Sequence, residues 1–280
     1  MNRIDQLFRE KDSDILSVYF TAGYPELHDT RHIIQGLEKS GADLVEIGFP
    51  FSDPVADGPV IQASSHKALE NGMNLDILFA QLAEIRNSSS IPKILMGYFN
   101  VVYQFGMDGF IERCSEAGID GLIIPDLPPE IYQLEYQRIV ESAGIHFICL
   151  VSPQTPAGRI RYLSGISRGF LYLLSSSSTT GQFLDSDSSR DLPDWRGKKS
   201  SGKPSNPVEL PALIGFGIHD RSTFRMACDH ASGGIVGSEF IRRLGSIPVP
   251  EAGVRLEPEF REKQIYAVCR RFVEDVRGKK

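Results

Sequence analysis

Three acidic side chains occur between residues 46 and 57, where they could share one site: Glu46, Asp53 and Asp57. Glu46 ends an apolar run, and a Gly-Phe-Pro turn leads from it to a short loop that carries the two aspartates. Because α/β folds place functional side chains at the C-terminal ends of strands, we expect Glu46 to project from a strand end and the loop to line an active site. Taken singly, each aspartate could instead start a turn or cap a helix.

Two carboxylates in different surroundings can divide acid–base work between them. Glu46 has the apolar neighbours Val45 and Phe49, so we expect its pKa to be raised and the side chain to act as acid and base. Asp57 lies in a polar loop and is expected to stay ionised. A metal ion is the usual rival explanation for paired acids, but no histidine lies at ligand spacing from either residue, so no metal site is predicted.

Two glycine turns in the second half of the chain are typical of a phosphate-binding site. Gly217 follows one apolar run and precedes a helical segment, whereas Gly237 and Ser238 follow the next run and precede the short helical segment 239–244. A phosphate dianion needs several backbone N–H donors at close range, which glycine permits. A lone glycine is more often a plain turn, but barrels commonly build a phosphate site from two such loops.

Eight short apolar runs alternate with segments whose apolar residues have helical spacing. Such alternation indicates βαβ units around a parallel sheet that is buried on both faces. An open, doubly wound sheet would look the same strand by strand, but such sheets usually stop near about six strands. The count therefore favours an α/β fold of the closed (β/α)8 type, with residues 1–280 as a single domain. The expected strands are residues 15–20, 44–49, 94–98, 121–125, 147–151, 170–174, 213–216 and 235–237, and the expected helices are residues 30–39, 60–71, 75–86, 107–117, 129–142 and 222–230, with Gly41, Gly118 and Gly144 as helix stops.

Two further helices and one irregular tract complete this pattern. Residues 1–9 are expected to form an extra helix over the N-terminal mouth of the barrel, and residues 258–276 a long closing helix with one apolar face. After Phe183 the chain is rich in Ser, Asp, Pro and Gly and has no helical apolar stripe, which predicts a degenerate or disordered segment after strand six. The candidates to cover that side of the barrel are Leu192, Trp195 and Val208.

Charge and composition indicate which kinds of molecule the chain could bind and in which compartment it works. The net charge is −6 and no long basic block interrupts the chain, so no nucleic acid is expected to bind. The four cysteines lie far apart and suit reduced, mostly buried thiols. The charged start lacks the apolar core of a secretory signal, and no apolar stretch of about 20 residues could cross a bilayer. A cytoplasmic protein without membrane association is therefore predicted.

Segments spread along the chain resemble, in their order, those of the tryptophan synthase alpha subunit family. The stretch GADLVEIGFPFSDPVADGP, residues 41–59, is closely similar to the signature segment of that family. The resemblance implies a phosphate-binding (β/α)8 barrel, or TIM barrel, that cleaves indole-3-glycerol phosphate to indole and glyceraldehyde 3-phosphate in tryptophan biosynthesis. The further segments are SVYFTAGYP at residues 17–25, LMGYFN at 95–100, IPDLP at 124–128, GFGI at 215–218 and VGS at 236–238.

The resemblance also implies roles for individual residues. The family's matching acids make Glu46 the acid and base, and make Asp57 the acceptor of a hydrogen bond from the indole N–H. Thr180 would hydrogen-bond Asp57 when a mobile lid closes. A barrel-strand aromatic is more often plain core, so only the resemblance selects the indole slot. The slot residues are Tyr19, Tyr98, Leu150 and Tyr172, the phosphate-binding residues are Gly181, Phe216, Gly217, Gly237 and Ser238, and Asn100 and Asp126 match positions near the substrate or the subunit interface.

The family further implies a partner. No cofactor is expected on this chain, and pyridoxal phosphate is expected on a tryptophan synthase beta subunit, with two alpha and two beta chains in a heterotetramer. The expected lid departs from the family, because Ser176, Ser178 and Thr179 stand where many relatives carry Arg, Gly and Val, and a Ser/Thr-rich loop is costly to order. Two alternatives remain open: a stand-alone lyase that releases free indole, and a weakly active alpha-like subunit that mainly binds and activates the beta subunit.

Overall fold

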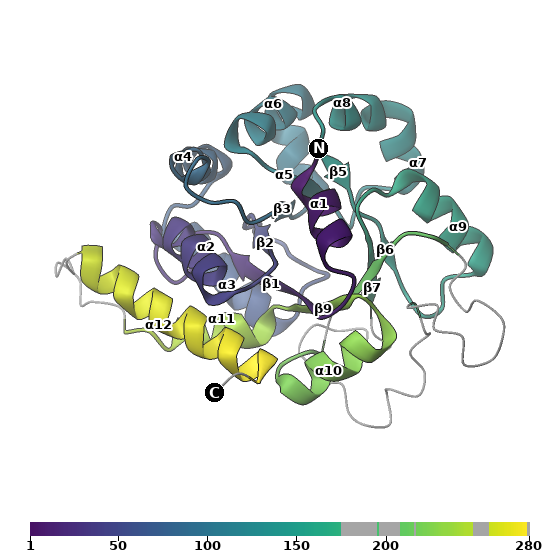
Figure 1. Ribbon diagram of the computed structural model, residues 1–280. Helices are drawn as coiled ribbons and strands as arrows, with labels where there is room; N and C mark the ends of the chain where they lie inside the picture. The colour runs from purple at the N-terminus through teal and green to yellow at the C-terminus, as the bar shows by residue number, and fades with distance from the viewer. Residues whose placement is uncertain (175–194, 196–207, 216, 249–257, 279–280) are drawn as a thin grey trace.

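Nine parallel strands form one sheet in the order β5-β4-β3-β2-β1-β9-β8-β7-β6, with helices around its outer face (Figure 1). The computed structural model describes residues 1–174, 195, 208–215, 217–248 and 258–278. Every strand pair is parallel, as the alternation of apolar runs and helices predicts. The strands are β1 (Ile15–Thr21), β2 (Leu44–Gly48), β3 (Lys93–Met96), β4 (Gly121–Ile123), β5 (His146–Phe147), β6 (Leu150–Val151), β7 (Leu171–Leu174), β8 (Ala212–Gly215) and β9 (Gly233–Val236).

The sheet closes on itself through one short stretch of chain. The first strand, β1, pairs with β9, and the two ends of the strand order are β5 and β6, which belong to a single apolar run. Within this run the Ile148 N–H donates to the Leu122 carbonyl at 3.0 Å, and the Cys149 carbonyl accepts from the Tyr172 N–H at 3.0 Å. The eight predicted runs thus form the predicted (β/α)8 barrel, and the ninth strand arises because the fifth run is interrupted.

Side chains alternate between the barrel interior and the helical shell. Ile15, Ser17 and Tyr19 of β1 occupy one face, whereas Val18 and Phe20 pack into the large cluster shared with the helices. Such alternation is the period-two geometry of a strand. An inner cluster fills the N-terminal half of the barrel and consists of Ile4, Ile15, Leu44, Ile94, Ile123, Ile148, Phe170, Tyr172, Leu213 and Ile235.

The extra N-terminal helix, α1 (Arg3–Glu10), closes the N-terminal mouth of the barrel and lies across its front in the view of Figure 1. Its Ile4 is fully buried in the inner cluster, so the helix supplies one apolar plug. Arg3 forms an ion pair with Asp120 at 2.8 Å, and Asn2 caps the helix by accepting from the Ile4 N–H. The prediction of a covering helix is confirmed.

The predicted helices are present, and two more occur. Gly41, Gly118 and Gly144 have φ angles of 91°, 70° and 72°, the left-handed values that end a helix most easily at glycine. The two helices that sequence patterns missed are α5 (Phe99–Phe105) and α9 (Ala157–Ile166). The others are α2 (Asp29–Ser40), α3 (Pro59–Glu70), α4 (Leu75–Ile85), α6 (Met107–Ala117), α7 (Pro129–Ile131), the π-helical η1 (Tyr132–Tyr136), α8 (Gln137–Ser142), α10 (Arg221–His230), α11 (Ser238–Gly245) and α12 (Pro258–Arg277).

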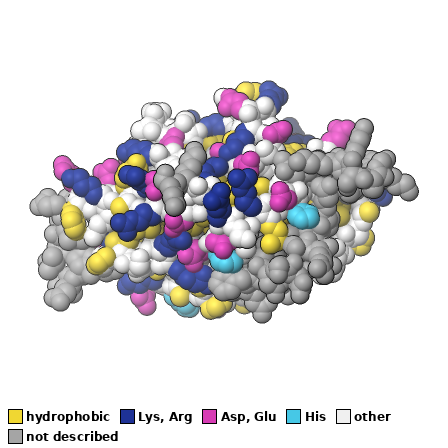
Figure 2. Space-filling view, turned by 60° about the horizontal axis from the view of Figure 1, so that its bottom comes forward, with side chains coloured by type: hydrophobic (Ala, Val, Ile, Leu, Met, Phe, Trp, Pro, Cys, Tyr) yellow, Lys and Arg dark blue, Asp and Glu magenta, His cyan; other side chains and the backbone are white. Residues whose placement is uncertain are grey.

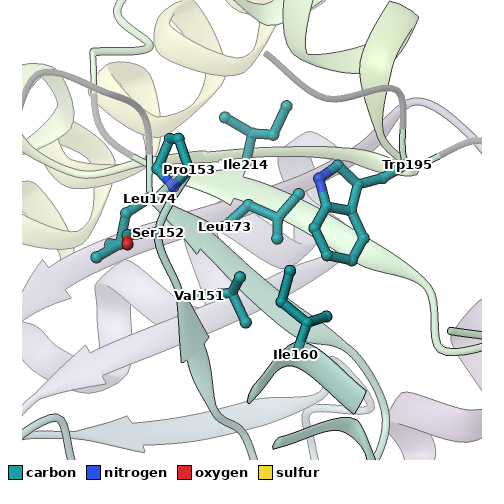
Figure 3. A pocket seen from close by; sticks show the side chains of 8 residues that line it. All are labelled: Val151, Ser152, Pro153, Ile160, Leu173, Leu174, Trp195 and Ile214. Atoms are coloured by element: carbon teal, nitrogen blue, oxygen red, sulfur yellow. The ribbon is translucent and has the colours of Figure 1, made fainter. Parts of the chain in front are cut away.

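Trp195 covers the outer face of the sheet next to α9. The indole ring lies beside Leu173 and Ile160 around a small cavity of about 30 Å³ (Figure 3). Trp195 is only 7% exposed, and its backbone N–H donates to the His230 carbonyl at 2.8 Å. Val208 also packs against the core, so two of the three residues expected to cover this side do so. Leu192 and the rest of the irregular tract lie outside the described residues.

Trp195→Ala is expected to lower the free energy of unfolding by about 3–5 kcal/mol, because it removes a large buried ring and enlarges an existing cavity. Urea unfolding followed by far-UV circular dichroism measures the change, since Trp195 is the only tryptophan and its fluorescence would be lost. Trp195→Phe is the matched control and should cost less. A loss below about 1 kcal/mol for the alanine variant would show that Trp195 is not a core residue.

Candidate active site

Glu46 lies inside the barrel, in the middle of β2. Its strand neighbours are Tyr19 on β1 and Ile94 on β3, and its side chain is 0% exposed. The strand expected at residues 44–49 is confirmed as β2, but Glu46 is its middle residue, and the alternation along the strand turns its carboxyl group to the barrel interior instead of aiming it off the strand end. The position is one side-chain layer above Leu44 of the inner cluster, so Glu46 is walled below by apolar groups.

Burial and one hydrogen bond set the proton affinity of Glu46. Burial raises its pKa to about 7, and the hydrogen bond from Ser17 partly opposes this rise. The Ser17 Oγ donates to Oε1 at 2.7 Å, whereas Oε2 has no hydrogen-bond partner in the described part of the chain. A carboxyl group with a pKa near neutrality and one open oxygen can both give and take a proton. Its raised pKa agrees with the sequence-based expectation.

Asp57 lies in the loop between β2 and α3, directly above the barrel interior. The Tyr98 hydroxyl donates to its Oδ2 at 3.3 Å and accepts from the Ala56 N–H at 3.1 Å, so one tyrosine fixes this part of the loop. The Gln62 side chain also donates to the Asp57 carbonyl at 2.8 Å. The rings of Tyr98 and Phe51 lie 5.1 Å apart and add apolar contact.

The surroundings of Asp57 are less polar than the sequence suggested. The residue is half-buried, and burial raises its pKa to about 6, with the Tyr98 hydrogen bond partly opposing the rise. The expectation of a polar setting is therefore corrected, since the folded loop packs onto the barrel mouth. Near pH 7 the group is still mostly ionised, so the two acids differ in protonation as expected.

Two buried tyrosines lie in the interior together with the acids. Burial raises the pKa of Tyr19 and of Tyr172, and the negative charges of Glu46 and Asp57 raise both further. Each carboxyl group is therefore close enough to both tyrosines to interact with them electrostatically. These four predicted residues come together from β1, β2, β7 and the β2–α3 loop, which are separated in sequence.

Glycines at two strand ends make room for the tyrosine rings. A Cβ on Gly48 would collide with the Tyr19 hydroxyl, and a Cβ on Gly215 would collide with the Tyr172 ring. Neither glycine was singled out for this role, although a glycine that ends an apolar run is the signal for a close approach. Ser17 was also missed, because a serine within an apolar run carries no motif. Of the remaining slot residues, Tyr98 and Leu150 are half-buried, and Leu150 packs against the inner cluster.

The described parts of the predicted phosphate site lie at the C-terminal ends of neighbouring strands. Strands β8 and β9 pair, so Gly217 and Gly237 follow adjacent strands. Gly217 has a φ of 76°, and Gly237 precedes α11, whose first residue is Ser238. A Cβ on Gly237 would lie 3.2 Å from the Tyr19 ring, which places the start of α11 beside the slot. Thr180, Gly181 and Phe216 lie outside the described residues.

Other classes of site find little support in the described ranges. No group of three or more His, Cys, Asp or Glu side chains there could hold a metal ion, and no described helix is long and apolar enough to span a bilayer. Figure 2 shows Lys and Arg interleaved with Asp and Glu rather than forming one basic field on that face. Ion pairs among the described residues include Arg243 with Asp275 and Arg270 with Glu274.

Sequence comparison finds relatives over most of the chain. A family model described as tryptophan synthase alpha chain matches residues 6–272. The chain is 49% identical over 246 residues to the tryptophan synthase alpha chain of Christiangramia forsetii, which covers 87% of this chain and 93% of that protein. It is 46% identical over 256 residues to that of Bacteroides fragilis, covering 91% of this chain and 94% of that protein.

Known structures agree in fold. Tryptophan synthase subunit alpha from Legionella pneumophila superposes with a TM-score of 0.80 and 31% identity, over 99% of each chain. A chain of tryptophan synthase from M. tuberculosis, in an aminoacrylate-bound form, gives 0.78 and 25% identity over 99% of this chain and all of that one. The barrel, the acids Glu46 and Asp57 in its interior and at its mouth, and these matches lead to one conclusion: the chain belongs to the tryptophan synthase alpha chain family.

Proposed function

We propose that this chain is a carbon–carbon lyase that cleaves indole-3-glycerol phosphate to indole and glyceraldehyde 3-phosphate, with Glu46 and Asp57 as its catalytic residues. The observation that carries the proposal is the fully buried Glu46, whose Oε2 accepts no hydrogen bond from the described residues and whose pKa is near neutrality. Cleavage needs a proton delivered to the indole C3, a proton taken from the glyceryl hydroxyl, and stabilisation of positive charge at the ring nitrogen.

The two acids can share these tasks without any net loss of protons. Protonated Glu46 gives its proton to the indole C3, and the resulting carboxylate takes the proton from the glyceryl hydroxyl as the carbon–carbon bond breaks. The electron pair of that bond returns to the indole ring, and Glu46 ends protonated. Ionised Asp57 accepts the indole N–H and stabilises the positive charge that forms when C3 is protonated.

These roles of Glu46 and Asp57 predict how the activity depends on pH. The reactive form has Asp57 ionised and Glu46 protonated. Activity should therefore fall as pH drops through the Asp57 pKa of about 6, and fall again as pH rises through the Glu46 pKa of about 7. Because kcat/KM reports groups of the free enzyme, it is the quantity in which these two limbs should appear.

The direct test is to mix the purified full-length protein with indole-3-glycerol phosphate and follow indole release with and without a beta subunit. Indole release that increases with the beta subunit supports the lyase within a complex. Full activity without the beta subunit would favour the stand-alone lyase, whereas stimulation of the beta subunit without indole release would favour a binding and activating subunit. Absence of both effects would refute the proposed function.

Gly217→Asp is expected to weaken binding of glycerol 3-phosphate by at least about tenfold, because it sets a negative charge where a dianion would meet backbone N–H groups. The φ of 76° at Gly217 strains any side chain. Gly217→Asn is therefore the matched control, since it carries nearly the same strain without the charge. Titration calorimetry measures both. Equal affinity in the two variants would place the phosphate elsewhere.

Three exposed apolar side chains on consecutive βα units support docking of a beta subunit on this side of the barrel. Val55, Tyr103 and Leu134 are 86%, 69% and 80% exposed, and they follow the consecutive strands β2, β3 and β4. Large exposed apolar side chains on neighbouring βα units are candidates for contact with a partner protein. Asn100 is exposed on the same helix as Tyr103, and Asp126 accepts from the Phe99 N–H at 2.8 Å at the start of that helix.

The composition of the complex is part of the same proposal. Two alpha and two beta chains are expected, with pyridoxal phosphate on the beta subunit and no cofactor on this chain. A groove of about 390 Å³ between the loop at Phe51–Asp53 and α5 would accept a projecting side chain of the partner. Size-exclusion chromatography with light scattering on a mixture of the two chains gives the stoichiometry.

A further inference from the structure

Ser17 is the one described residue whose side chain hydrogen-bonds to Glu46. Its Oγ donates to Oε1 at 2.7 Å, both residues are 0% exposed, and Oε2 accepts no hydrogen bond from the described residues. We propose that Ser17 is a positioning residue, which holds Oε1 so that Oε2 is the oxygen that exchanges protons with the substrate. This inference rests on the proposed lyase function and assigns a role to a residue that no motif indicates.

The barrel gives Ser17 little freedom to move. It lies in the middle of β1, which pairs with β2 on one side and β9 on the other, so its backbone is fixed from both edges. Ser17 itself is opposite Leu44 on β2 and Ile235 on β9. Its short side chain has a single rotatable bond before the oxygen, so the hydroxyl is held with small loss of entropy.

A hydroxyl is suited to hold a carboxyl group that changes its protonation state. It donates to Oε1 of the carboxylate, and it also donates to Oε1 of the carboxylic acid when the proton is on Oε2, so the contact persists through a cycle in which Glu46 gives and regains a proton. Without a fixed partner, the terminal torsion of glutamate is broad, and either oxygen could face the substrate. The same bond favours the ionised form and so opposes the rise in the pKa of Glu46 that burial causes.

Two substitutions that are nearly isosteric with each other separate the effect of the hydroxyl group from the effect of added volume. Ser17→Val and Ser17→Thr add similar volume, but only threonine keeps the hydroxyl, and both side chains suit a strand. Ser17→Val is expected to lower kcat roughly tenfold with little change in KM, because a misaligned oxygen slows proton transfer more than it weakens binding. Its alkaline limb should move to higher pH by about one pH unit. Ser17→Thr should keep the pH profile of the parent.

Ser17→Ala guards against a packing artefact, because it removes the hydroxyl without adding bulk. It should shift the alkaline limb in the same direction as Ser17→Val. If both hydroxyl-free variants kept the parent's limb, or if Ser17→Thr shifted as far as Ser17→Val, the positioning role would be overturned.

Infrared difference titration gives a readout that does not need turnover. The carboxylate band of Glu46, identified by its loss in Glu46→Gln, should titrate at higher pH in Ser17→Ala than in the parent protein. An unshifted band overturns the inference even if indole is released. If the band shifts in Ser17→Ala but the parent protein releases no indole, the lyase function is refuted while the Ser17 contact with Glu46 is established.

Discussion

Glu46→Gln is expected to lower the rate of indole release by about 10²- to 10⁴-fold, the usual contribution of a general acid–base group. Glutamine is nearly isosteric with glutamate and can still accept from the Ser17 Oγ, but it cannot exchange a proton with the substrate. The loss should appear in kcat, with binding of glycerol 3-phosphate unchanged, because no phosphate donor is removed. Stopped-flow or coupled assay of indole, together with calorimetry of the phosphate ligand, measures both quantities.

A folding defect would mimic this loss and needs its own control. Since Glu46 is buried, the variant's unfolding midpoint in urea should be compared with that of the parent. Neutral Gln removes a group whose ionised form is disfavoured by burial, so stability should not fall by more than about 1 kcal/mol. A well-folded variant that still turns over at the parent rate would end the assignment of Glu46 as the acid and base.

Asp57→Asn is expected to lower kcat/KM by about 10²-fold, because it removes the charge that stabilises the protonated indole ring. It should also change the shape of the pH profile. Asparagine does not titrate, so the limb expected near the Asp57 pKa of about 6 should disappear, while the alkaline limb of Glu46 remains. A pH series of kcat/KM is the measurement. Retention of the acid limb would show that another group produces it.

Two further variants serve as comparisons for Asp57→Asn. The hydrogen bond from Tyr98 to Asp57 Oδ2 lowers the pKa of that carboxyl group. Tyr98→Phe removes this bond, so the acid limb should move to higher pH instead of vanishing. Asp53→Asn changes an exposed acid of the same loop and should leave the rate close to that of the parent. An equal loss in Asp53→Asn would mean that loop charge in general, rather than Asp57, governs the reaction.

Local patterns predicted the elements well where one physical signal dominated. The apolar runs are confirmed as strands because a strand buried on both faces must be apolar throughout. The starts and ends of α6 and of α3 follow from glycine and proline, whose backbone preferences act locally. Helix α9 was missed because its sequence contains two arginines and two glycines, which weaken the helical pattern, and α5 because it is short and directly follows β3.

Local sequence patterns were less informative about the environment of the Asp57 and Glu46 side chains in the folded protein. The sequence placed Asp57 in a polar loop, but the loop folds onto the barrel mouth, where Tyr98 from the next βα unit contacts it. The sequence also suggested that Glu46 projects off the end of its strand, whereas the closed barrel turns the carboxyl group of this mid-strand residue to the interior. Both errors concern contacts between elements that are distant along the chain, which periodicity does not encode.

The sequence by itself determined the order of the strands, the α/β class, the two candidate acids and the family resemblance, because these depend on residue type and spacing. Only the tertiary structure decided that Glu46 is sealed inside the barrel, that Ser17 holds one of its oxygens, and that Trp195 covers the outer face beside α9. The physical reason is that burial and hydrogen bonding are properties of the closed barrel. Closure brings β1, β2, β7 and the β2–α3 loop around one interior, and that shared, water-poor space sets the proton affinities on which the proposed chemistry depends.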